Sequence, residues 1–369
     1  MSAKGKIDPK RLRRLLRKLI DIYSPSGKEE EILGFLEGYL KRRNIPFDTQ
    51  DVDDYRYNII VTSDEDNIEL AFVGHLDTVT AYDLDHYEHE EEGDMISGLG
   101  AADMKGGCAA MIEAFLSLYE SGDEVPPVAL TLVVGEEEDG DGAAELVRDY
   151  QFPWAIIGEP TNLAPCLSHF GYLEVGLSTK GKRAHASLAH KGQTPVEVML
   201  KLALALTRYL EKKKPELIYN IRDLYSSRGG FIVPDVCETW IDIHLPPGTV
   251  VGELMSELEE VLNKDLKKSG QIEWSMRYET VDSGYELPQK GPVIESMMKV
   301  YEEEKMEWSP QPFRSHSDAN QLWEAGVRPV ILGPGNLGVA HSPDESISFS
   351  EVEKAAEIYA SLARKIVKQ

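Results

Sequence analysis

The sequence predicts an α/β protein with a mostly parallel central sheet flanked by helices, interrupted by a second and smaller α+β domain. Three observations predict this class. The chain has 369 residues, more than the roughly 250 to 300 residues that a single hydrophobic core usually serves. Apolar runs of strand length alternate with helical patterns in its first part and again in its last part. Between these parts the order of strands and helices is different.

The first part of the chain begins with two expected helices. Asp8-Pro9 forms a cap with a first-turn proline, and apolar residues then recur at helical spacing as far as Tyr23. A second helix is expected from about Glu29 to Arg43. The elements expected after it are strands at 58–62, 69–74, 128–134 and 155–158 and helices at 107–119 and 143–150. This alternation is typical of a largely parallel sheet.

The pattern changes after Pro165. Strands are expected at 173–178, 237–244 and 273–278, with helices at 195–212 and 251–267, an order that suits a small open-faced α+β sandwich. The first pattern resumes with a helix at 292–304, a strand at 329–332 and a helix at 350–368. We therefore assign residues 1–168 and 285–369 to one discontinuous domain and residues 169–284 to an insert.

Composition and charge exclude several kinds of partner. The sequence is 42% hydrophobic and 28% charged, and no apolar run approaches the roughly 20 residues of a membrane span, which predicts a soluble protein. A formal net charge of -25 would repel nucleic acids and anionic membranes. Residues 1–20 lack the apolar segment of a secretory signal. The three widely spaced cysteines indicate reduced thiols and a cytoplasmic location.

Metal-binding residue types follow several of the expected strands. His75 and Asp77 follow the strand at 69–74, and alternation along an extended backbone sends both to one side. Glu136 and Glu137 follow the strand at 128–134, where stability does not explain consecutive acids because like charges repel. The strand at 155–158 leads into Glu159. Because the carboxyl ends of parallel strands meet at one edge, these side chains can converge there.

Two further candidates lie in turn-rich segments. Asp103 sits after glycines and just before an expected helix, so an N-terminal cap is its ordinary explanation and a metal ligand is the other. His341 follows the strand at 329–332. Together with the acids at the strand ends, these are the ligand types that a pair of hard or borderline metal ions requires. The set indicates a two-metal hydrolase.

The five ordered motifs resemble those of the dizinc deacylase and carboxypeptidase family, which includes acetylornithine deacetylase, succinyl-diaminopimelate desuccinylase, aminoacylase and glutamate carboxypeptidase. The motifs are His75-Leu76-Asp77, Ala102-Asp103-Met104-Lys105, Glu136-Glu137, Glu159-Pro160-Thr161 and Ala340-His341-Ser342. The resemblance covers nearly the whole chain. It implies a zinc-exopeptidase-like catalytic domain interrupted by a ferredoxin-like lid and dimerisation domain, and a homodimer.

The resemblance also implies the role of each residue. It implies two Zn²⁺ ions, with Co²⁺ or Mn²⁺ as possible substitutes, one held by His75, Asp103 and Glu159 and the other by Asp103, Glu137 and His341. Glu136 would be the general base. Apart from the resemblance, Asp77 is placed to orient the imidazole of His75, because a histidine ligand commonly donates its second ring N–H to a carboxylate; a capping Asp beside an incidental His is the alternative. The family further places a cis peptide bond after the bridging aspartate, here Asp103-Met104.

Substrate contacts are expected in and near the insert. His185, in Gly181-Lys182-Arg183-Ala184-His185, resembles a lid histidine that reaches the partner subunit's active site and stabilises the oxyanion. Many relatives carry a lid arginine that binds a substrate carboxylate, and His244 stands in its place here. Arg314 and Arg228 are candidates to replace that arginine.

These residues predict an amidohydrolase that frees an amino acid from a small N-acyl form. It would act like acetylornithine deacetylase or release lysine or ornithine from an amino-group carrier, and Glu rather than Asp at position 159 resembles the deacylase branch. The alternative within the family is a metallocarboxypeptidase or dipeptidase that cleaves short peptides. A catalytically silent binding relative is the alternative from another class, and its mark would be a missing ligand or base. The sequence does not name the acyl group.

Overall fold

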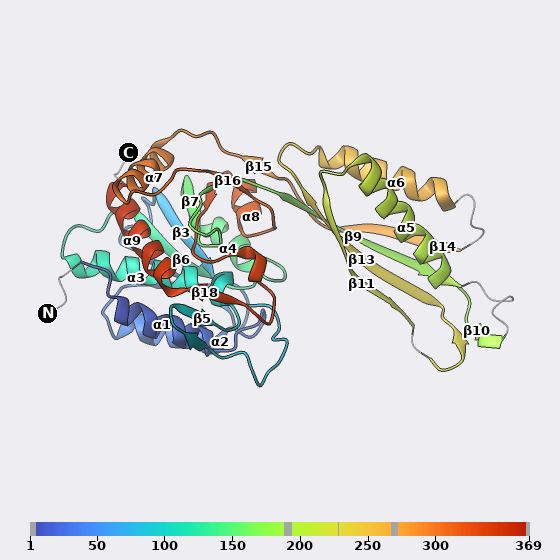
Figure 1. Cartoon of the computed structure of the whole chain (residues 1–369), viewed down its shortest axis with the longest axis horizontal. Coiled ribbons are helices and arrows are strands. Elements are labelled where there is room, and N and C mark those ends of the chain that lie inside the picture. The colour runs from blue at the N-terminus through green and yellow to red at the C-terminus, as the bar shows by residue number, and fades with distance from the viewer. Residues whose placement is uncertain (1–4, 188–193, 228, 267–271, 367–369) are drawn as a thin grey trace. The chain divides into compact units, whose positions relative to one another are not determined.

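The computed structural model describes residues 5–187, 194–227, 229–266 and 272–366 (Figure 1). Arg228, one of the expected substrate contacts, lies outside these residues. The chain divides into two compact units. The first comprises Met1–Ser168, Leu287–Phe313 and Ser317–Gln369, and the second comprises His169–Glu286 and Arg314–His316. Each unit has its own sheet and its own helices.

The first unit contains a mixed sheet whose centre is parallel (Figure 1). Its strands run in the order β1-β2-β6-β3-β7-β17-β8, and β16 also pairs with β8. Their bounds are β1 Asp48–Asp51, β2 Tyr57–Thr62, β6 Val128–Val133, β3 Leu70–His75, β7 Trp154–Ile157, β17 Arg328–Ile331, β8 Cys166–His169 and β16 Gln311–Phe313. All residues of β3, β6 and β7 are buried. The predicted α/β class and its mostly parallel central sheet are confirmed.

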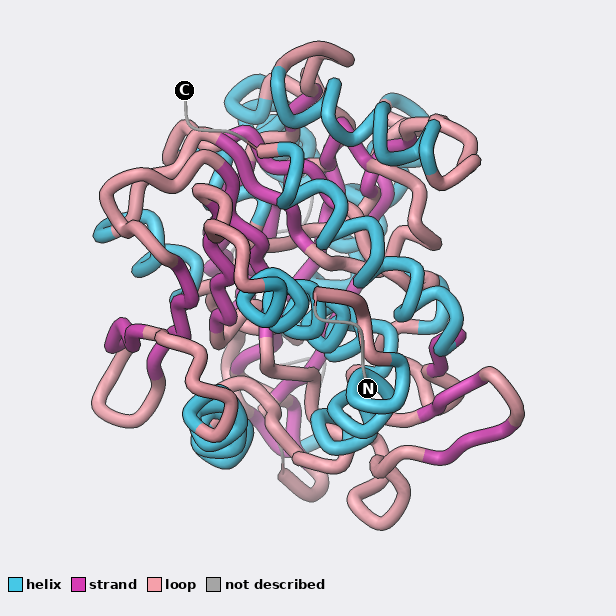
Figure 2. Tube along the Cα trace, turned by 90° about the vertical axis from the view of Figure 1, so that its left-hand side faces the viewer, coloured by secondary structure: helices cyan, strands magenta, loops and turns pink. Residues whose placement is uncertain are grey.

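Helices pack on both faces of this sheet, in the unit that faces the viewer in Figure 2. The chain passes from β3 to β6 through α3 (Gly106–Ser121) and from β6 to β7 through α4 (Asp141–Asp149). Because β6 and β7 flank β3 on opposite sides, right-handed crossovers place these two helices on opposite faces. The other helices of this unit are α1 Pro9–Ile20, α2 Glu30–Lys41, α7 Pro292–Glu303, α8 Ala319–Glu324 and α9 Phe349–Lys365. None of the helices within the described residues combines the length and apolar character needed to cross a bilayer.

A small antiparallel ribbon brings the end of the chain back to its first third. Its strands are β4 (Glu90–Glu92), β5 (Met95–Ser97) and β18 (Ser346–Ser348), in the order β18-β5-β4. Ser346 pairs with Ser97, so the segment that follows His341 lies beside the segment that precedes Asp103.

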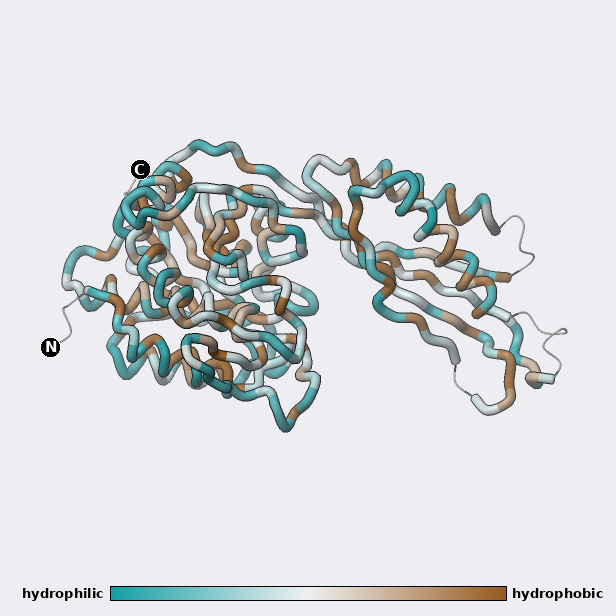
Figure 3. Tube along the Cα trace, in the orientation of Figure 1, coloured by the Kyte–Doolittle hydropathy of each residue, from teal (hydrophilic) through white to brown (hydrophobic). Residues whose placement is uncertain are grey.

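The second unit is an antiparallel sheet with two helices packed against it (Figure 1). The strand order is β11-β13-β9-β14, with bounds β11 Ile218–Ser226, β13 Val236–Leu245, β9 Gly171–Lys180 and β14 Glu273–Asp282. The helices are α5 (Pro195–Lys213) and α6 (Val251–Leu266), and short strands lie at β10 Ala184–His185, β12 Ile232–Val233 and β15 Tyr285–Glu286. Hydrophobic residues recur along its helices and strands (Figure 3), and the buried ones form one core.

The structure differs from the expected elements and boundaries in several places, of which two bear on the second unit. The edge strand β11 was not expected, because most of its residues are exposed and its sequence carries charges among the apolar residues. The short segment Arg314–His316 groups with the second unit, although the sequence assigned it to the first domain. The reason is packing: His316 Nε2 lies 2.9 Å from Asp282 Oδ2, and its ring lies 5.2 Å from that of Tyr172.

Candidate metal centre

The carboxyl ends of three neighbouring parallel strands bring the candidate ligands to one edge of the sheet. His75 is the last residue of β3, and its backbone pairs with Val133 at the end of β6. Val73 of β3 pairs with Ile157 at the end of β7. The acids Glu136 and Glu159 follow β6 and β7 within three residues. Adjacent strands of one direction therefore place these side chains together, as the sequence predicted.

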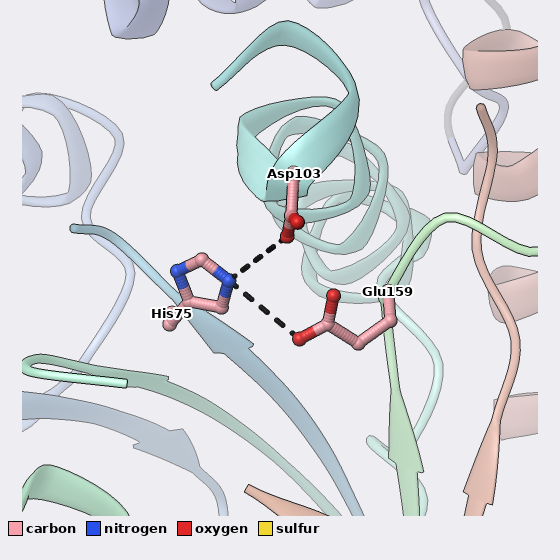
Figure 4. A group of neighbouring side chains, drawn as sticks. All are labelled: His75, Asp103 and Glu159. Atoms are coloured by element: carbon pink, nitrogen blue, oxygen red, sulfur yellow. Dashed lines mark hydrogen bonds and ion pairs between the residues drawn. The ribbon is translucent and has the colours of Figure 1, made fainter. Parts of the chain in front are cut away.

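His75 lies at the centre of this group and is fully buried. Its Nε2 is 3.3 Å from Asp103 Oδ1 and 3.6 Å from Glu159 Oε1 (Figure 4). Its Nδ1 is 3.0 Å from the backbone carbonyl oxygen of Asp77. A donor bond from Nδ1 to that carbonyl leaves Nε2 free to bind a cation, which is the usual arrangement of a metal-binding histidine.

Asp77 has a different set of contacts from the one expected. Its carboxylate oxygen Oδ1 is 3.6 Å from His75 Nδ1, farther than its own carbonyl oxygen. The carboxylate instead accepts the backbone N–H groups of Glu136 at 3.2 Å and Glu137 at 3.0 Å, and the hydroxyl of Ser26 at 2.6 Å. Asp77 thus fixes the backbone that carries both acids and orients His75 through its main chain.

Asp103 connects two groups of side chains. Oδ1 faces His75, while Oδ2 lies 3.4 Å from His341 Nε2. His341 Nε2 is in turn 3.0 Å from Glu137 Oε2. A single carboxylate that meets one histidine with each oxygen has the geometry of a ligand shared by two cations. The peptide bond Asp103-Met104 is cis, as the resemblance implied.

Among the described residues, three sets of side chains have ligand atoms within 4.8 Å of one another. The sets are His75, Asp103 and Glu159; Asp103, Glu137 and His341; and His75, Glu136 and Glu137. The first two sets share Asp103 and correspond to the two ligand sets that the resemblance implied. The third set shows that Glu136 also lies within reach of His75, so distance alone does not separate a base from a ligand.

His341 reaches the centre from an unusual backbone conformation. Its φ is +57°, in the left-handed region that residues other than glycine rarely adopt. Such a conformation persists where the surroundings hold it, and it is often found at functional sites. The side chain of His341 is 50% exposed, whereas that of Asp103 is 8% exposed. His341 therefore closes the centre on the side that faces solvent.

Glu345 is a residue of this centre that the sequence did not reveal. Its Oε1 accepts the backbone N–H groups of Ala102 at 2.9 Å and Asp103 at 3.0 Å, and its Oε2 accepts that of Gly100 at 3.1 Å. The residue is 3% exposed, and burial raises the pKa of its carboxyl to about 7. Glu345 therefore ties the loop of Asp103 to the segment that carries His341. In the sequence, only its position four residues after His341 indicated that Glu345 could lie near the centre.

The ionisation of the cluster fits a cation site. Burial raises the pKa of the Glu136 and Glu159 carboxyls well above their ordinary range, and neighbouring acids add to the shift. Burial opposes ionisation of Asp103 too, but its hydrogen bonds to two histidines hold its pKa below the usual range. The hydrogen bonds of His341 to Asp103 and to Glu137 raise the pKa of its imidazole to about 11. Crowded, buried acids of this kind are stabilised by divalent cations, and imidazole with carboxylate suits Zn²⁺.

The expected substrate residues that are described all belong to the second unit. His185 is exposed, and its Nδ1 lies 2.8 Å from Ser187 Oγ. His244 is partly buried, and burial lowers its pKa below the ordinary value. Arg314 is exposed. The roles of these residues toward a substrate stay predictions.

The chain is similar to known proteins over most of its length. Residues 71–365 match Peptidase family M20/M25/M40. Acetylornithine deacetylase of Vibrio atlanticus (strain LGP32) is 26% identical over 353 residues, which cover 91% of each chain. Acetylornithine deacetylase of Aliivibrio salmonicida (strain LFI1238) is 29% identical over 315 residues, covering 80% of this chain and 81% of the relative.

Solved structures share the fold. The crystal structure of a tripeptidase from Staphylococcus aureus superposes with a TM-score of 0.79 at 19% identity and covers 99% of both chains. At that identity the likeness shows the fold alone. The match to the family, in contrast, extends over most of the chain and includes every residue of the clusters described above. The chain therefore belongs to Peptidase family M20/M25/M40 and is a hydrolase that acts on amide or peptide bonds.

Proposed function

We propose that this hydrolase releases an amino acid from an N-acyl amino acid by means of two metal ions. The observation that carries the proposal is the position of Asp103, whose two oxygens face His75 and His341 at 3.3 and 3.4 Å. The relatives named acetylornithine deacetylase support the N-acyl substrate. The tripeptidase shares the fold, so short peptides are the alternative substrates.

The proposed ligand sets follow the two clusters that share Asp103. His75 and Glu159 complete one set, and Glu137 and His341 complete the other. Zn²⁺ is the proposed metal because both sets combine imidazole with carboxylate. When bound, a pair of divalent cations polarises the scissile carbonyl and lowers the pKa of water at the site.

Glu136 is the proposed general base. Its Oε2 lies 3.9 Å from His75 Nε2, and Glu136 belongs to neither of the two ligand sets that share Asp103. The backbone N–H of Glu136 donates to Asp77 Oδ1, and this bond holds Glu136 beside the cluster. The Glu136 carboxylate takes a proton from the attacking water, whose oxygen bonds to the acyl carbon. The C–N bond then breaks, and the departing amine receives the proton from Glu136.

The substitution Glu136→Gln tests this role. Gln has the same shape but does not take up a proton, so we expect turnover to fall by a factor of about 10² to 10⁴ while the bound metal is unchanged. Glu138→Gln is the matched control, because Glu138 is exposed and belongs to none of the described ligand clusters. Metal analysis beside a turnover assay decides the point. Loss of metal together with activity would make Glu136 a ligand and refute its role as base.

The substrate class is tested with N-acetylornithine and N-succinyl-diaminopimelate beside dipeptides and tripeptides. We expect the metal-loaded enzyme to release amino acid from an N-acyl substrate with the larger kcat/KM. Faster cleavage of the peptides would indicate a metallocarboxypeptidase or dipeptidase instead. Failure to cleave either class would favour a catalytically silent binding relative. Against that alternative, the chain has a residue at every position of both ligand sets and at the position of the base.

We also propose that the protein works as a cytoplasmic homodimer in which His185 of one chain acts at the other chain's centre. The exposure of His185 on the second unit supports a role outside its own unit. Sedimentation combined with an activity assay tests this proposal. A monomer with full activity would exclude it, and His185→Ala should lower kcat without removing metal.

A further inference from the structure

A pocket of about 240 Å³ lies between α1 and α2, within the first unit. The residues of α1 that line it are at positions 11, 14, 15 and 18, and those of α2 and the turn that ends it are at positions 35, 39, 42 and 43. Intervals of three and four residues place side chains on one face of a helix, so the pocket lies between two facing stripes. None of these positions belongs to the described candidate ligand clusters of the metal centre.

This pocket concentrates positive charge in a protein that is strongly acidic overall. Five of its eight lining residues are cations, and none is an aspartate or a glutamate. The cations are Arg11, Arg14, Lys18, Arg42 and Arg43. The formal net charge of the whole chain is -25. Because like charges that share one pocket repel one another, an anion bound among them is stabilised.

Most of these cations have no acidic partner. Arg11 is the exception, because its guanidinium donates to both oxygens of Glu113, at 2.7 and 2.8 Å, and to Glu120 at 2.5 Å. Within the part of the chain that the structure describes, the other four cations of the pocket take part in no ion pair. Their charges are therefore available to a ligand.

A buried hydroxyl in the same pocket also lacks a partner. Tyr39 lines the pocket and is 6% exposed, and its hydroxyl oxygen has no hydrogen-bond partner among the described residues. Burial raises the pKa of this phenol, whereas the positive charges of Arg43 and Arg14 lower it, so the hydroxyl lies near cations of the pocket. Buried polar groups of folded proteins are almost always hydrogen-bonded. The hydroxyl can donate to an anion that the arginines attract.

The helix dipoles explain only part of this cluster. Lys18 is in the last turn of α1, and Arg42 and Arg43 follow the last turn of α2, where positive side chains interact favourably with the carboxyl end of a helix. Arg14 lies in the middle of α1, so the dipole does not account for it. Nor does it account for the hydroxyl of Tyr39. These two groups point to a bound anion.

A phosphate group on a small molecule fits these donors best. The planar guanidinium offers paired N–H groups that match phosphate oxygens, and a phosphate monoester carries about 1.5 to 2 negative charges, more than one carboxylate. The cavity is smaller than the roughly 300 to 1,000 Å³ of sites for drug-sized ligands. A nucleic acid or an anionic membrane would extend beyond it and be repelled by a protein with a net charge of -25.

From these contacts we infer that the pocket between α1 and α2 binds the phosphate group of a small molecule, with Arg14, Arg42 and the hydroxyl of Tyr39 among its donors. The site is separate from the metal centre, and the inference does not depend on the function proposed above. Phosphate bound there connects the two helices and binds only the folded chain. It therefore raises the stability of the protein in proportion to its occupancy.

Thermal unfolding of the metal-loaded protein with increasing sodium phosphate, at constant ionic strength, tests the site. Arg14→Gln should raise the apparent Kd of phosphate about tenfold, because it removes a charged donor. Lys10→Gln is the matched control, since it removes a charge from the same helix outside the pocket. Arg42→Gln and its control Lys41→Gln form the corresponding pair on α2. Phosphate that binds at the metal centre, or that acts through the solvent, affects both members of a pair alike.

Tyr39→Phe gives a result that a purely structural hydroxyl would not produce. Without phosphate, the variant should be at least as stable as wild type, because it loses a buried hydroxyl that has no partner among the described residues. With phosphate, it should gain less stability than wild type, because a donor to the anion is absent. Wild-type phosphate affinity in Tyr39→Phe, or equal affinities within the Arg14 and Lys10 pair, would overturn the inference.

Sedimentation with vesicles separates a small phosphate compound from a lipid headgroup. The vesicles contain equal parts of phosphatidylcholine and phosphatidylglycerol, and we expect the wild-type protein to stay in the supernatant. Pelleting of wild type that Arg14→Gln abolishes and Lys10→Gln does not would assign the pocket to a membrane surface. That outcome would overturn the small-molecule ligand.

Discussion

Asp103 is the residue on which the arrangement of the centre depends. Each of its oxygens meets a different histidine, and His75 and His341 are otherwise separated by more than half of the chain. Its own position is set by Glu345, which accepts its backbone N–H and that of Ala102. The backbone of a candidate metal ligand is thus held by a buried carboxylate, and Asp77 does the same for Glu136 and Glu137.

The residue scale also shows what sequence reasoning reaches and what it misses. His75, Glu136 and Glu159 could be anticipated because each follows an apolar run, and the ends of such runs can be read locally. Glu345 could not, because its importance lies in backbone bonds to residues that are 242 to 245 positions away. Asp77 was anticipated as a partner of His75, but its bonds to two backbone N–H groups depend on the exact turn after β6.

Replacing Glu345 should therefore affect both stability and metal binding. Glu345→Ala leaves three buried N–H groups without their acceptor, and each such group costs about 1 to 3 kcal/mol. Glu345→Gln retains one carbonyl oxygen that can serve Ala102 and Asp103, so it should recover a large part of the loss. Denaturant unfolding of the two variants, each with its zinc content measured, checks this order. Equal stability of Glu345→Ala and wild type would contradict the positioning role.

At the scale of elements, the centre depends on how closely α3 approaches the end of β7. The contact is made by glycines: a Cβ atom on Gly107 of α3 would lie 2.2 Å from the backbone oxygen of Gly158. Gly107 comes four residues after Asp103, and Gly158 directly precedes Glu159. The absence of a side chain at this crossing is what allows these two acids to reach the same imidazole.

Two glycine-to-alanine substitutions in helices should consequently have opposite effects. Gly107→Ala forces α3 away from a backbone oxygen, which we expect to destabilise the fold and weaken metal binding. Gly34→Ala in α2 meets no atom within 4 Å and should stabilise the protein by about 0.5 to 1 kcal/mol through helix propensity. Thermal unfolding and zinc titration of both variants provide the check. Unchanged stability and zinc affinity of Gly107→Ala would show that α3 and the end of β7 can lie farther apart without loss.

Elements differ in how well their sequences predict them. The helices α1 and α9 have long apolar stripes, and β3, β6 and β7 are short runs of fully buried residues, so all five were expected. The exposed edge strand β11 and the three-residue strands of the ribbon β18-β5-β4 lack such patterns. These strands pair with segments that are distant in the sequence, and the periodicity of a short segment does not identify its partner.

At the scale of the whole molecule, the described metal-binding clusters lie entirely in the first unit, although its sequence is interrupted by the second. The segment with His341 follows the second unit in the chain and returns to pair with β5. The expected substrate residues His185, His244 and Arg314 belong to the second unit. A chain folded in this way keeps the described candidate ligands at one sheet edge of the first unit.

The most direct test of the central claim, that Asp103 is shared by two metal ions, is a zinc titration of the chelator-stripped protein. We expect wild type to bind about two equivalents of Zn²⁺ per chain and regain activity as the second binds. His341→Ala, which lacks a ligand of one set only, should retain about one equivalent. Asp103→Asn should weaken both sites and retain less zinc than His341→Ala. Binding of two equivalents by Asp103→Asn with wild-type affinity, or of a single equivalent by an active wild-type protein, would contradict the account.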